Sequence, residues 1–503
     1  MLIYRIRRVK CDETKPSCLR CIKFRWICDG YLQTRRDYGS TRILATRHKL
    51  CPLSRPSQEP SLALFENDAE GRYYRLFCET TASRLGGYYD SDLWNRIIQQ
   101  ASIGVSSIRH VVIALAALDL SSMTSTFQRS SMDGQDCGSD AYRRHQFALQ
   151  QYSRAIKEMR EDLTNTKQDL RTTLIATILI VCFEAYHGNY EAALGQFRSG
   201  QQVLDEWKAT HKHLLEDGIS SPAPHVVEDE VIRTFTQLEI QVITHTDDMP
   251  LDVHLRLKES GASGLAKMPK IFQTVEDALI YGKIVMRRCV HFVSMCWAYD
   301  DGNSAAPSTS FSLMDRVSAC TNPEAFREQE KYVKELIRWH DAFLPILQRA
   351  RTPTGKEYFF AATCLQMHYL ITYIGVISAL VTNELFYDSL TTMFVEIVTL
   401  SKIVFGHSEK SNFTCAFRAI LPLDLVAKKC RDPAIRREAI QLLLGKPRRE
   451  VFWDSITAAK VCLWVVKIEE EGMVGDYVSE EMRVRNIGVK FNVDEKKLFV
   501  SCK

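Results

Sequence analysis

The sequence predicts a mostly α-helical protein with a small cysteine-rich motif at its amino end. Three observations lead to this fold class. Four cysteines stand at regular spacing within residues 11–28, residues 32–60 are polar and hold three prolines, and a helical pattern of apolar residues begins near residue 65. Because the chain has 503 residues, we expect two or more folded units.

Charge separates the amino end from the rest of the chain. Residues 1–50 contain 13 Lys and Arg against 4 Asp and Glu, whereas the totals of 65 and 61 leave 52 basic and 57 acidic residues for 51–503. A basic arm on a mildly acidic body is typical of a nucleic-acid-binding protein. The hydrophobic content of 46% and charged content of 25% argue against a disordered or fibrous chain.

The cysteine-rich stretch reads "RIRRVKCDETKPSCLRCIKFRWICDGY" and covers residues 5–31. Six, two and six residues separate its cysteines, which are Cys11, Cys18, Cys21 and Cys28. Four thiolates match the tetrahedral coordination of structural zinc, and zinc binding would supply folding free energy on the order of 10 kcal/mol to a segment without a core. The alternative is four unligated thiols. The other cysteines are scattered singly and no secretory signal precedes them, so we expect a reducing compartment.

This stretch resembles the cluster of the fungal binuclear zinc-cluster transcription regulators, C-x2-C-x6-C-x6-C-x2-C-x6-C. The resemblance runs from just after the second cysteine of that pattern to its end, and Pro16 lies where the family often has a proline. It implies a zinc-cluster DNA-binding domain over residues 1–31, with two short helices around the metal. It also implies double-stranded DNA as the partner and the nucleus as the location.

Two ligands of the family pattern are replaced, because Met1 and Tyr4 stand where the first two cysteines would be. In the family, the first and fourth cysteines bridge two zinc ions, so four thiolates allow at most one closed site. That site would use Cys11, Cys18, Cys21 and Cys28 after a rearrangement. A different first exon ending in CxxC would restore the motif, and we expect either such a start or a degenerate cluster.

Basic residues precede and interrupt the cysteines. In the family, the interval before the third cysteine is a short helix that enters the major groove at a CGG-type triplet. The resemblance therefore implies that Arg7 and Arg8 read guanine, whose O6 and N7 atoms are both acceptors. Phosphate contacts are implied for Arg5, Lys10, Lys15 and Lys23. The alternative is a generic basic or nuclear-import tail.

Residues 32–67 are expected to form a linker. Pro52, Pro56 and Pro60 interrupt a polar, basic segment without hydrophobic periodicity. It contains no heptads, so a dimer would have to form without a coiled coil there.

The remaining residues, 68–503, are predicted to form a large helical domain. Apolar residues recur on one helical face in 141–163, and Asp169 is a plausible N-cap of a second helix that ends near Gly188-Asn189. A return helix through Leu204 would complete a hairpin. Further helices are expected near 225–245, 271–299, 323–349, 356–384, 390–404, 433–445 and 452–470. The segment "VRNIGVKFNV" is predicted to form a short strand or an extended tail.

One stretch is long enough to cross a bilayer, since Tyr358–Thr382 has no charged residue for 25 positions. Thr363, Gln366 and His368 dilute its hydrophobicity and no strong basic flank sets an orientation. We therefore expect a buried helix and no membrane partner.

The helical region also resembles the fungal-specific regulatory domain of these factors, in "YYRLFCETTASRLGGYYDSDLWNRIIQQAS", "IRHVVIALAALD" and "VFWDSITAAKVCLWVVKIEEEG". This implies regulation through a small-molecule effector or co-regulator proteins. No GxGxxG, Walker-type, HExxH or GxSxG motif occurs, so an enzyme is not expected. We expect His110, His145, His187 and His368 to be core or surface residues rather than ligands.

The sequence thus predicts a nuclear, zinc-dependent, sequence-specific DNA-binding regulator of RNA polymerase II genes that reads CGG-type half-sites. The alternative is a regulator that has lost DNA binding and acts through protein or ligand contacts of the helical domain.

Overall fold

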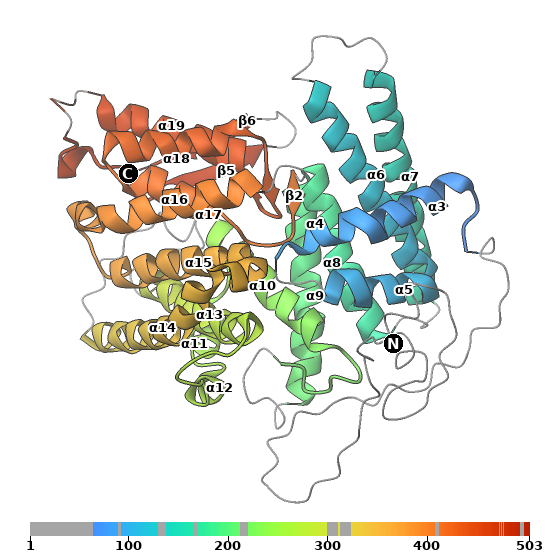
Figure 1. Cartoon of the computed structure of the whole chain (residues 1–503), viewed down its shortest axis with the longest axis horizontal. Helices are drawn as coiled ribbons and strands as arrows, with labels where there is room; N and C mark the ends of the chain where they lie inside the picture. Colours follow the sequence, from blue (N-terminus) through green and yellow to red (C-terminus); the bar gives the residue numbers. More distant parts are fainter. Residues whose placement is uncertain are drawn as a thin grey trace, which may run out of the picture. The chain divides into compact units, whose positions relative to one another are not determined.

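The computed structural model describes residues 64–88, 92–128, 137–164, 169–211, 220–298, 310–311, 323–407, 412–471, 473, 475, 477–492 and 497–502. All of them belong to one compact unit, Leu62–Lys503. The cysteine motif and almost all of the predicted linker lie outside the described residues. The described part is mostly helical, as predicted (Figure 1).

The first group of helices occupies residues 68–210 (Figure 1). Helices α6 and α7 pack along one another, and α8 lies beneath α6. In chain order the elements are α3 (Asp68–Leu76), the π-helical turn η2 (Phe77–Thr81), α4 (Ala82–Gly86), the π-helical turn η3 (Leu93–Ile97), α5 (Ile98–Gly104), α6 (Ser106–Gln128), α7 (Cys137–Thr164), α8 (Leu170–His187) and α9 (Tyr190–Thr210).

The predicted hairpin is formed by α8 and α9. The Asp169 carboxylate accepts a hydrogen bond from the Thr172 backbone N at 2.6 Å, which satisfies one of the free N–H groups at the start of α8. Gly188 ends the helix with φ 99°, in the left-handed region that favours glycine. Asn189 then caps α9 by accepting from the Ala192 backbone N. These local signals explain why the sequence predicted this pair correctly.

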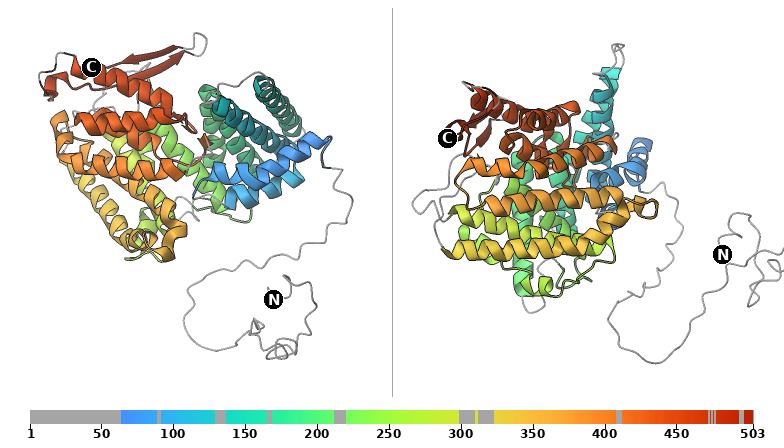
Figure 2. Two further views of the ribbon diagram at one scale, coloured as in Figure 1. Left: turned by 45° about the horizontal axis from the view of Figure 1, so that its top comes forward. Right: turned by 60° about the vertical axis from the view of Figure 1, so that its left-hand side comes forward.

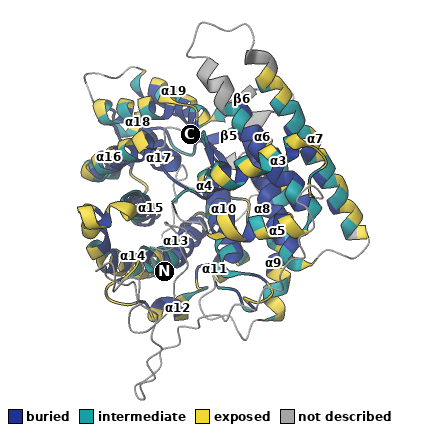
Figure 3. Ribbon diagram, turned by 45° about the vertical axis from the view of Figure 1, so that its right-hand side comes forward, coloured by how far each residue is buried: buried dark blue, intermediate teal, exposed yellow. Residues whose placement is uncertain are grey.

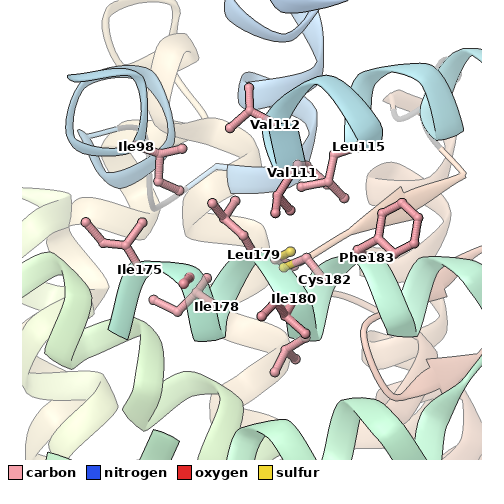
Figure 4. Packing of buried hydrophobic residues seen from close by; sticks show 14 of the residues in the cluster. Ile98, Val111, Val112, Leu115, Ile175, Ile178, Leu179, Ile180, Cys182 and Phe183 are labelled. Atoms are coloured by element: carbon pink, nitrogen blue, oxygen red, sulfur yellow. The ribbon is translucent and has the colours of Figure 1, made fainter. Parts of the chain in front are cut away.

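Helix α8 is apolar on all sides because it lies inside the first group. Ile175 and Leu179 of α8 point toward Ile98 of α5 and toward Val111 and Leu115 of α6, whereas Ile178 and Ile180 point to the opposite side (Figure 4). Burial of such side chains stabilises the fold by about 1.5–3 kcal/mol each. Helix α7 differs from α8, because buried and exposed residues alternate along it at helical spacing (Figure 3).

The second group of helices occupies residues 229–470 (Figure 2). Its elements are α10 (Asp229–His245), α11 (Leu251–Leu257), α12 (Ala262–Ala266), α13 (Val275–Ala298), α14 (Pro323–Ala350), the 3-10 turn η6 (Pro353–Tyr358), α15 (Phe359–Ser378), the 3-10 turn η7 (Glu384–Leu390), α16 (Thr391–His407), α17 (Ile420–Lys429), α18 (Pro433–Gly445) and α19 (Ser455–Glu470). The short helices α11, α12 and α17 were not predicted.

Helix α15 is central to this group, since it packs against α13, α14, α16 and α17. Among the described residues, Leu170–His187, Pro353–Ser378 and Glu384–His407 are each long and apolar enough to cross a membrane by length and composition. Most of the apolar window within Pro353–Ser378 is nevertheless buried in the protein. The apolar run of α15 therefore forms a helix buried in the protein interior, as predicted.

Short strands supplement the helices. Strand β2 (Phe413–Thr414) pairs in parallel with β3 (Arg449–Glu450), and β3 pairs antiparallel with β4 (Trp453–Asp454). The predicted strand in "VRNIGVKFNV" is β5 (Gly488–Asn492), which forms a hairpin with β6 (Lys497–Ser501) and also pairs with β1 (Ser310–Phe311). The predicted helix at 452–470 begins at Ser455, because β4 comes first and Asp454 caps α19 by accepting from the Thr457 backbone N.

Candidate functional site

The predicted zinc ligands and DNA-contacting residues all precede the described part of the chain. They are Cys11, Cys18, Cys21, Cys28, Arg5, Arg7, Arg8, Lys10, Lys15 and Lys23. Their assignment therefore stays a prediction from sequence. Across the described residues, no group of three or more His, Cys, Asp and Glu side chains could hold a metal ion.

A cavity within the second group of helices is the main candidate site in the helical domain. It has a volume of about 60 Å³ and lies among α10, α13, α15 and the segment that leads into α17. Its walls are predominantly apolar. The lining residues are Gln237, Ile240, Thr244, Leu279, Lys283, Met286, Cys289, Val290, Val293, Leu365, His368, Ile371, Thr372, Gly375, Phe417 and Leu421.

Several polar groups of the lining already have partners within the fold. The hydroxyl of Thr244 donates to the Ile240 carbonyl at 2.9 Å, and that of Thr372 donates to the His368 carbonyl at 2.7 Å. Both hydroxyl protons are thus used within their own helices. The Gln237 amide donates to the Cys415 carbonyl at 3.0 Å, which ties α10 to the segment before α17.

Lys283 and His368 are the two basic residues of the lining. Each side chain belongs to a residue only 6% exposed. Burial, assisted by the charge of Lys283, lowers the pKa of His368 to about 4, so this imidazole is neutral at pH 7. Among the residues that line the cavity, Lys283 is then the one cationic side chain and none is acidic.

A buried carboxylate fixes the start of α17 beside this cavity. Glu450 on β3 accepts hydrogen bonds from the backbone N atoms of Arg418 at 2.9 Å and Ala419 at 3.0 Å. The first N–H groups of a helix lack partners within the helix, and a negative charge there is stabilising. Glu450 is 2% exposed, and burial raises the pKa of its carboxyl group. This contact positions Phe417 and Leu421 against the cavity.

The structure also brings together histidine and acidic residues that the sequence analysis missed. The Nδ1 atoms of His254 on α11 and His291 on α13 lie 2.9 Å apart. Asp247 lies 3.2 Å from the Nε2 of His254, and Glu239 lies 3.5 Å from the Nε2 of His291. No motif links two histidines separated by 37 residues, so only the packing of α11 on α13 reveals the pair.

The isolated histidines named from the sequence occupy varied positions. His110 is a core residue, as expected. It is buried, and its Nδ1 atom lies 2.6 Å from the Oε1 atom of Gln151. The rings of His145 and His187 lie 5.2 Å apart, with no metal-ligand group around them in the described structure. His368 is a core residue as well, but it also lines the cavity, which its sequence context did not indicate.

Comparison with known proteins gives one family model and two curated relatives. Residues 5–38 match the family model described as Fungal Zn(2)-Cys(6) binuclear cluster domain. The chain is 27% identical over 223 residues to the transcription regulator lscL of Purpureocillium lilacinum, covering 42% of this chain and 49% of that protein. The predicted resemblance to the fungal zinc-cluster transcription regulators is thereby confirmed.

A second relative is the aspercryptin biosynthesis cluster-specific transcription regulator atnN of Emericella nidulans. It is 25% identical over 291 residues, which cover 54% of this chain and 43% of that protein. The chain thus matches about half the length of these curated relatives. No solved structure matches the chain.

Proposed function

Because residues 5–38 match the fungal Zn(2)-Cys(6) binuclear cluster domain, we propose that the protein is a zinc-dependent, sequence-specific DNA-binding transcription regulator. It acts in the nucleus on RNA polymerase II genes. The observation that supports this function is the coincidence of that match with the surplus of nine positive charges in residues 1–50, obtained as 13 minus 4. We propose no enzymatic activity, since both relatives are named as transcription regulators.

Zinc would be held by Cys11, Cys18, Cys21 and Cys28, whose four thiolates fit one tetrahedral ion. When bound, the ion orders a segment too short to form a core of its own. We propose the domain order 1–31 for the cluster, 32–67 for the linker and 68–503 for the helical domain.

DNA recognition is proposed for the basic residues around this cluster. Arg7 and Arg8 would donate to the O6 and N7 atoms of guanine in a CGG-type half-site, each worth about 1–3 kcal/mol of discrimination. Arg5, Lys10, Lys15 and Lys23 would contact phosphates, which sets affinity and salt dependence rather than sequence preference.

The helical domain would regulate this activity through an effector or through co-regulator proteins. One alternative function has its own supporting observation. Tyr4 stands where the family has a cysteine ligand, which favours a regulator without DNA binding that acts through the helical domain alone. The zinc content of the purified chain separates the two functions.

The test of DNA readout uses the full chain and a labelled duplex with CGG half-sites. We expect Arg7→Ala and Arg8→Ala to lose the preference for CGG over a scrambled duplex by roughly 10-fold or more each. Arg47→Ala is the matched control, because it removes the same charge from the predicted linker beyond the matched residues 5–38, and it should keep the preference. Equal preference in all three variants would reject the assignment of Arg7 and Arg8.

A further inference from the structure

A groove in the first group of helices has the size of a small-molecule site. It has a volume of about 410 Å³ and lies where side chains of α7, α8 and α9 meet. Ligand pockets in proteins commonly measure about 300–1,000 Å³ and are mostly apolar, with a few polar groups that fix orientation. The residues that line this groove are Tyr152, Ile156, Met159, Arg160, Thr173, Ala176, Thr177, Ile180, Glu184, Ala192 and Gln196.

Helix α8 supplies the buried part of the lining. Ala176, Thr177 and Ile180 are all buried, and the hydroxyl of Thr177 donates to the Thr173 carbonyl at 3.0 Å within the same helix. Ile156 and Met159 of α7 add further apolar surface. The aliphatic part of a ligand would therefore bury apolar area against α7 and α8, which favours binding.

Glu184 supplies a carboxylate to the wall of the groove. Its Oε1 atom accepts a hydrogen bond from the Tyr152 hydroxyl at 2.5 Å, and the Tyr152 ring stacks on Phe183 with the ring centroids 4.0 Å apart. Burial and the neighbouring carboxylate raise the pKa of Tyr152, so its hydroxyl keeps its proton at pH 7. Both hydrogen-bonded residues line the groove, and Tyr152 thus holds the carboxylate there.

The charge of Glu184 indicates the sign of the ligand. In the described part of the chain, no basic side chain forms an ion pair with Glu184. A carboxylate can accept several hydrogen bonds, and Tyr152 donates one of them. A ligand ammonium at this position would form a charge-assisted hydrogen bond with a partly buried anion, whereas a ligand carboxylate would be repelled.

Arg160 indicates the direction in which such a ligand lies. Tyr152 and Arg160 are eight positions apart on α7, which corresponds to about 12 Å along the axis at a rise of 1.5 Å per residue. The carboxylate held by Tyr152 and the exposed guanidinium group therefore mark opposite ends of the groove. An ammonium group is attracted to the first and repelled by the second, so an aliphatic chain would extend toward Arg160.

We propose that this groove binds an organic cation with an aliphatic chain, with its ammonium group at Glu184 and its chain against Ile156 and Ile180. The inference deepens the effector-dependent regulation proposed above and rests on it for its biological role. An occupant would touch α7, α8 and α9 together. Binding therefore stabilises the mutual packing of these helices.

The test is calorimetric titration of the full chain at pH 7 with octylammonium, octan-1-ol and octanoate, which share one chain length. Octylammonium should bind saturably and roughly 10-fold more tightly than octan-1-ol, and octanoate should bind more weakly than either. This comparison uses the wild-type chain alone, so it does not depend on any variant folding. It also needs neither zinc nor DNA, so its failure is distinct from a failure of the proposed DNA binding.

Variants of the lining locate the site. Glu184→Gln removes the charge but keeps an acceptor for Tyr152, so it should abolish the preference for octylammonium over octan-1-ol. Glu206→Gln is the matched control, because Glu206 is exposed on α9 outside the groove and accepts from Gln202, and it should keep the preference. Ala192→Leu places a larger side chain at the groove and should weaken the binding of both probes by roughly 10-fold.

Three results would overturn the proposal. The first is a lack of saturable octylammonium binding to the wild-type chain, or equal binding of all three probes. The second is an unchanged preference in a folded Glu184→Gln variant. The third is unchanged binding to a folded Ala192→Leu variant, which would place the cation elsewhere on the protein.

Discussion

The Nδ1 atoms of His254 and His291 lie 2.9 Å apart in the interior of the second group of helices. A hydrogen bond between two Nδ1 atoms requires one of them to carry a proton and the other to accept it. Asp247 and Glu239 lie near the opposite nitrogens of the two rings, and Arg287 binds Glu239 with an Nε–Oε2 distance of 2.6 Å. The shared proton therefore joins α11 to α13, and the Glu239 carboxylate near His291 connects the pair to α10.

This pair should contribute a measurable coupling energy. We expect His254→Ala and His291→Ala to be non-additive, with a coupling of about 1–2 kcal/mol, because either substitution alone already breaks the shared bond. Urea unfolding of both single variants and the double variant gives this energy. Additive changes in the free energy of unfolding would show that the two rings do not interact.

Acid should destabilise the helical domain through His368. Burial lowers the pKa of His368 from 6.5 to about 4 in the folded protein. Between these values the unfolded chain binds the proton and the folded protein does not, so stability is intact above pH 6.5 and falls as the pH drops toward 4. The full effect is a loss of roughly 3 kcal/mol.

The measurement is the free energy of unfolding of the wild type and of His368→Gln at several pH values from 7 to 4. The variant cannot titrate at this position, so its stability should fall less steeply over that range. Identical slopes for the two proteins would show that His368 is not the responsible group.

Removing the charge from Glu450 should loosen the start of α17. Glu450→Gln keeps an acceptor oxygen but loses the negative charge that the backbone N–H groups of Arg418, Ala419 and Ile420 contact, so we expect a destabilisation of about 1–3 kcal/mol. Thermal unfolding provides the measurement. Glu330→Gln is the control, because Glu330 is an exposed partner of Lys334 and should change stability little. Equal effects of the two changes would contradict the capping role.

The turn between α8 and α9 should require glycine. Gly188→Ala places a Cβ at φ 99°, which we expect to cost about 1 kcal/mol or more. Gly195→Ala is the opposite case. Gly195 lies inside α9, and a Cβ atom added there would have open space around it. That change should stabilise the helix by up to about 1 kcal/mol. The denaturant midpoints of both variants measure these opposite effects on stability. An unchanged midpoint for Gly188→Ala would contradict the requirement for glycine at this turn.

Sequence reasoning succeeded where the signal was local. Asp169 and Gly188 mark the ends of α8 by chemistry that acts within a few residues, and the uncharged run of α15 reflects burial on all sides. The cavity could not be predicted, because it depends on how α10, α13 and α15 pack. The burial of Lys283 could not be predicted either, since a lysine in an amphipathic helix ordinarily faces water.

The strand pairing was also out of reach of the sequence. Residues 413 and 449 form neighbouring strands although 35 residues separate them, counted from 414 to 448, and neither strand is long enough to show an alternating pattern. The cysteine motif is the reverse case. Its spacing is visible in the sequence and is matched by a family model, while its geometry lies outside the described residues.

The most direct test measures binding of the zinc-loaded full chain to a CGG-containing duplex and to its scrambled counterpart, before and after removal of zinc by a chelator. We predict preferential binding to CGG in the loaded protein and loss of that preference after chelation, with recovery when zinc is restored. A purified chain without bound zinc, or a preference that chelation leaves unchanged, would contradict the proposed function.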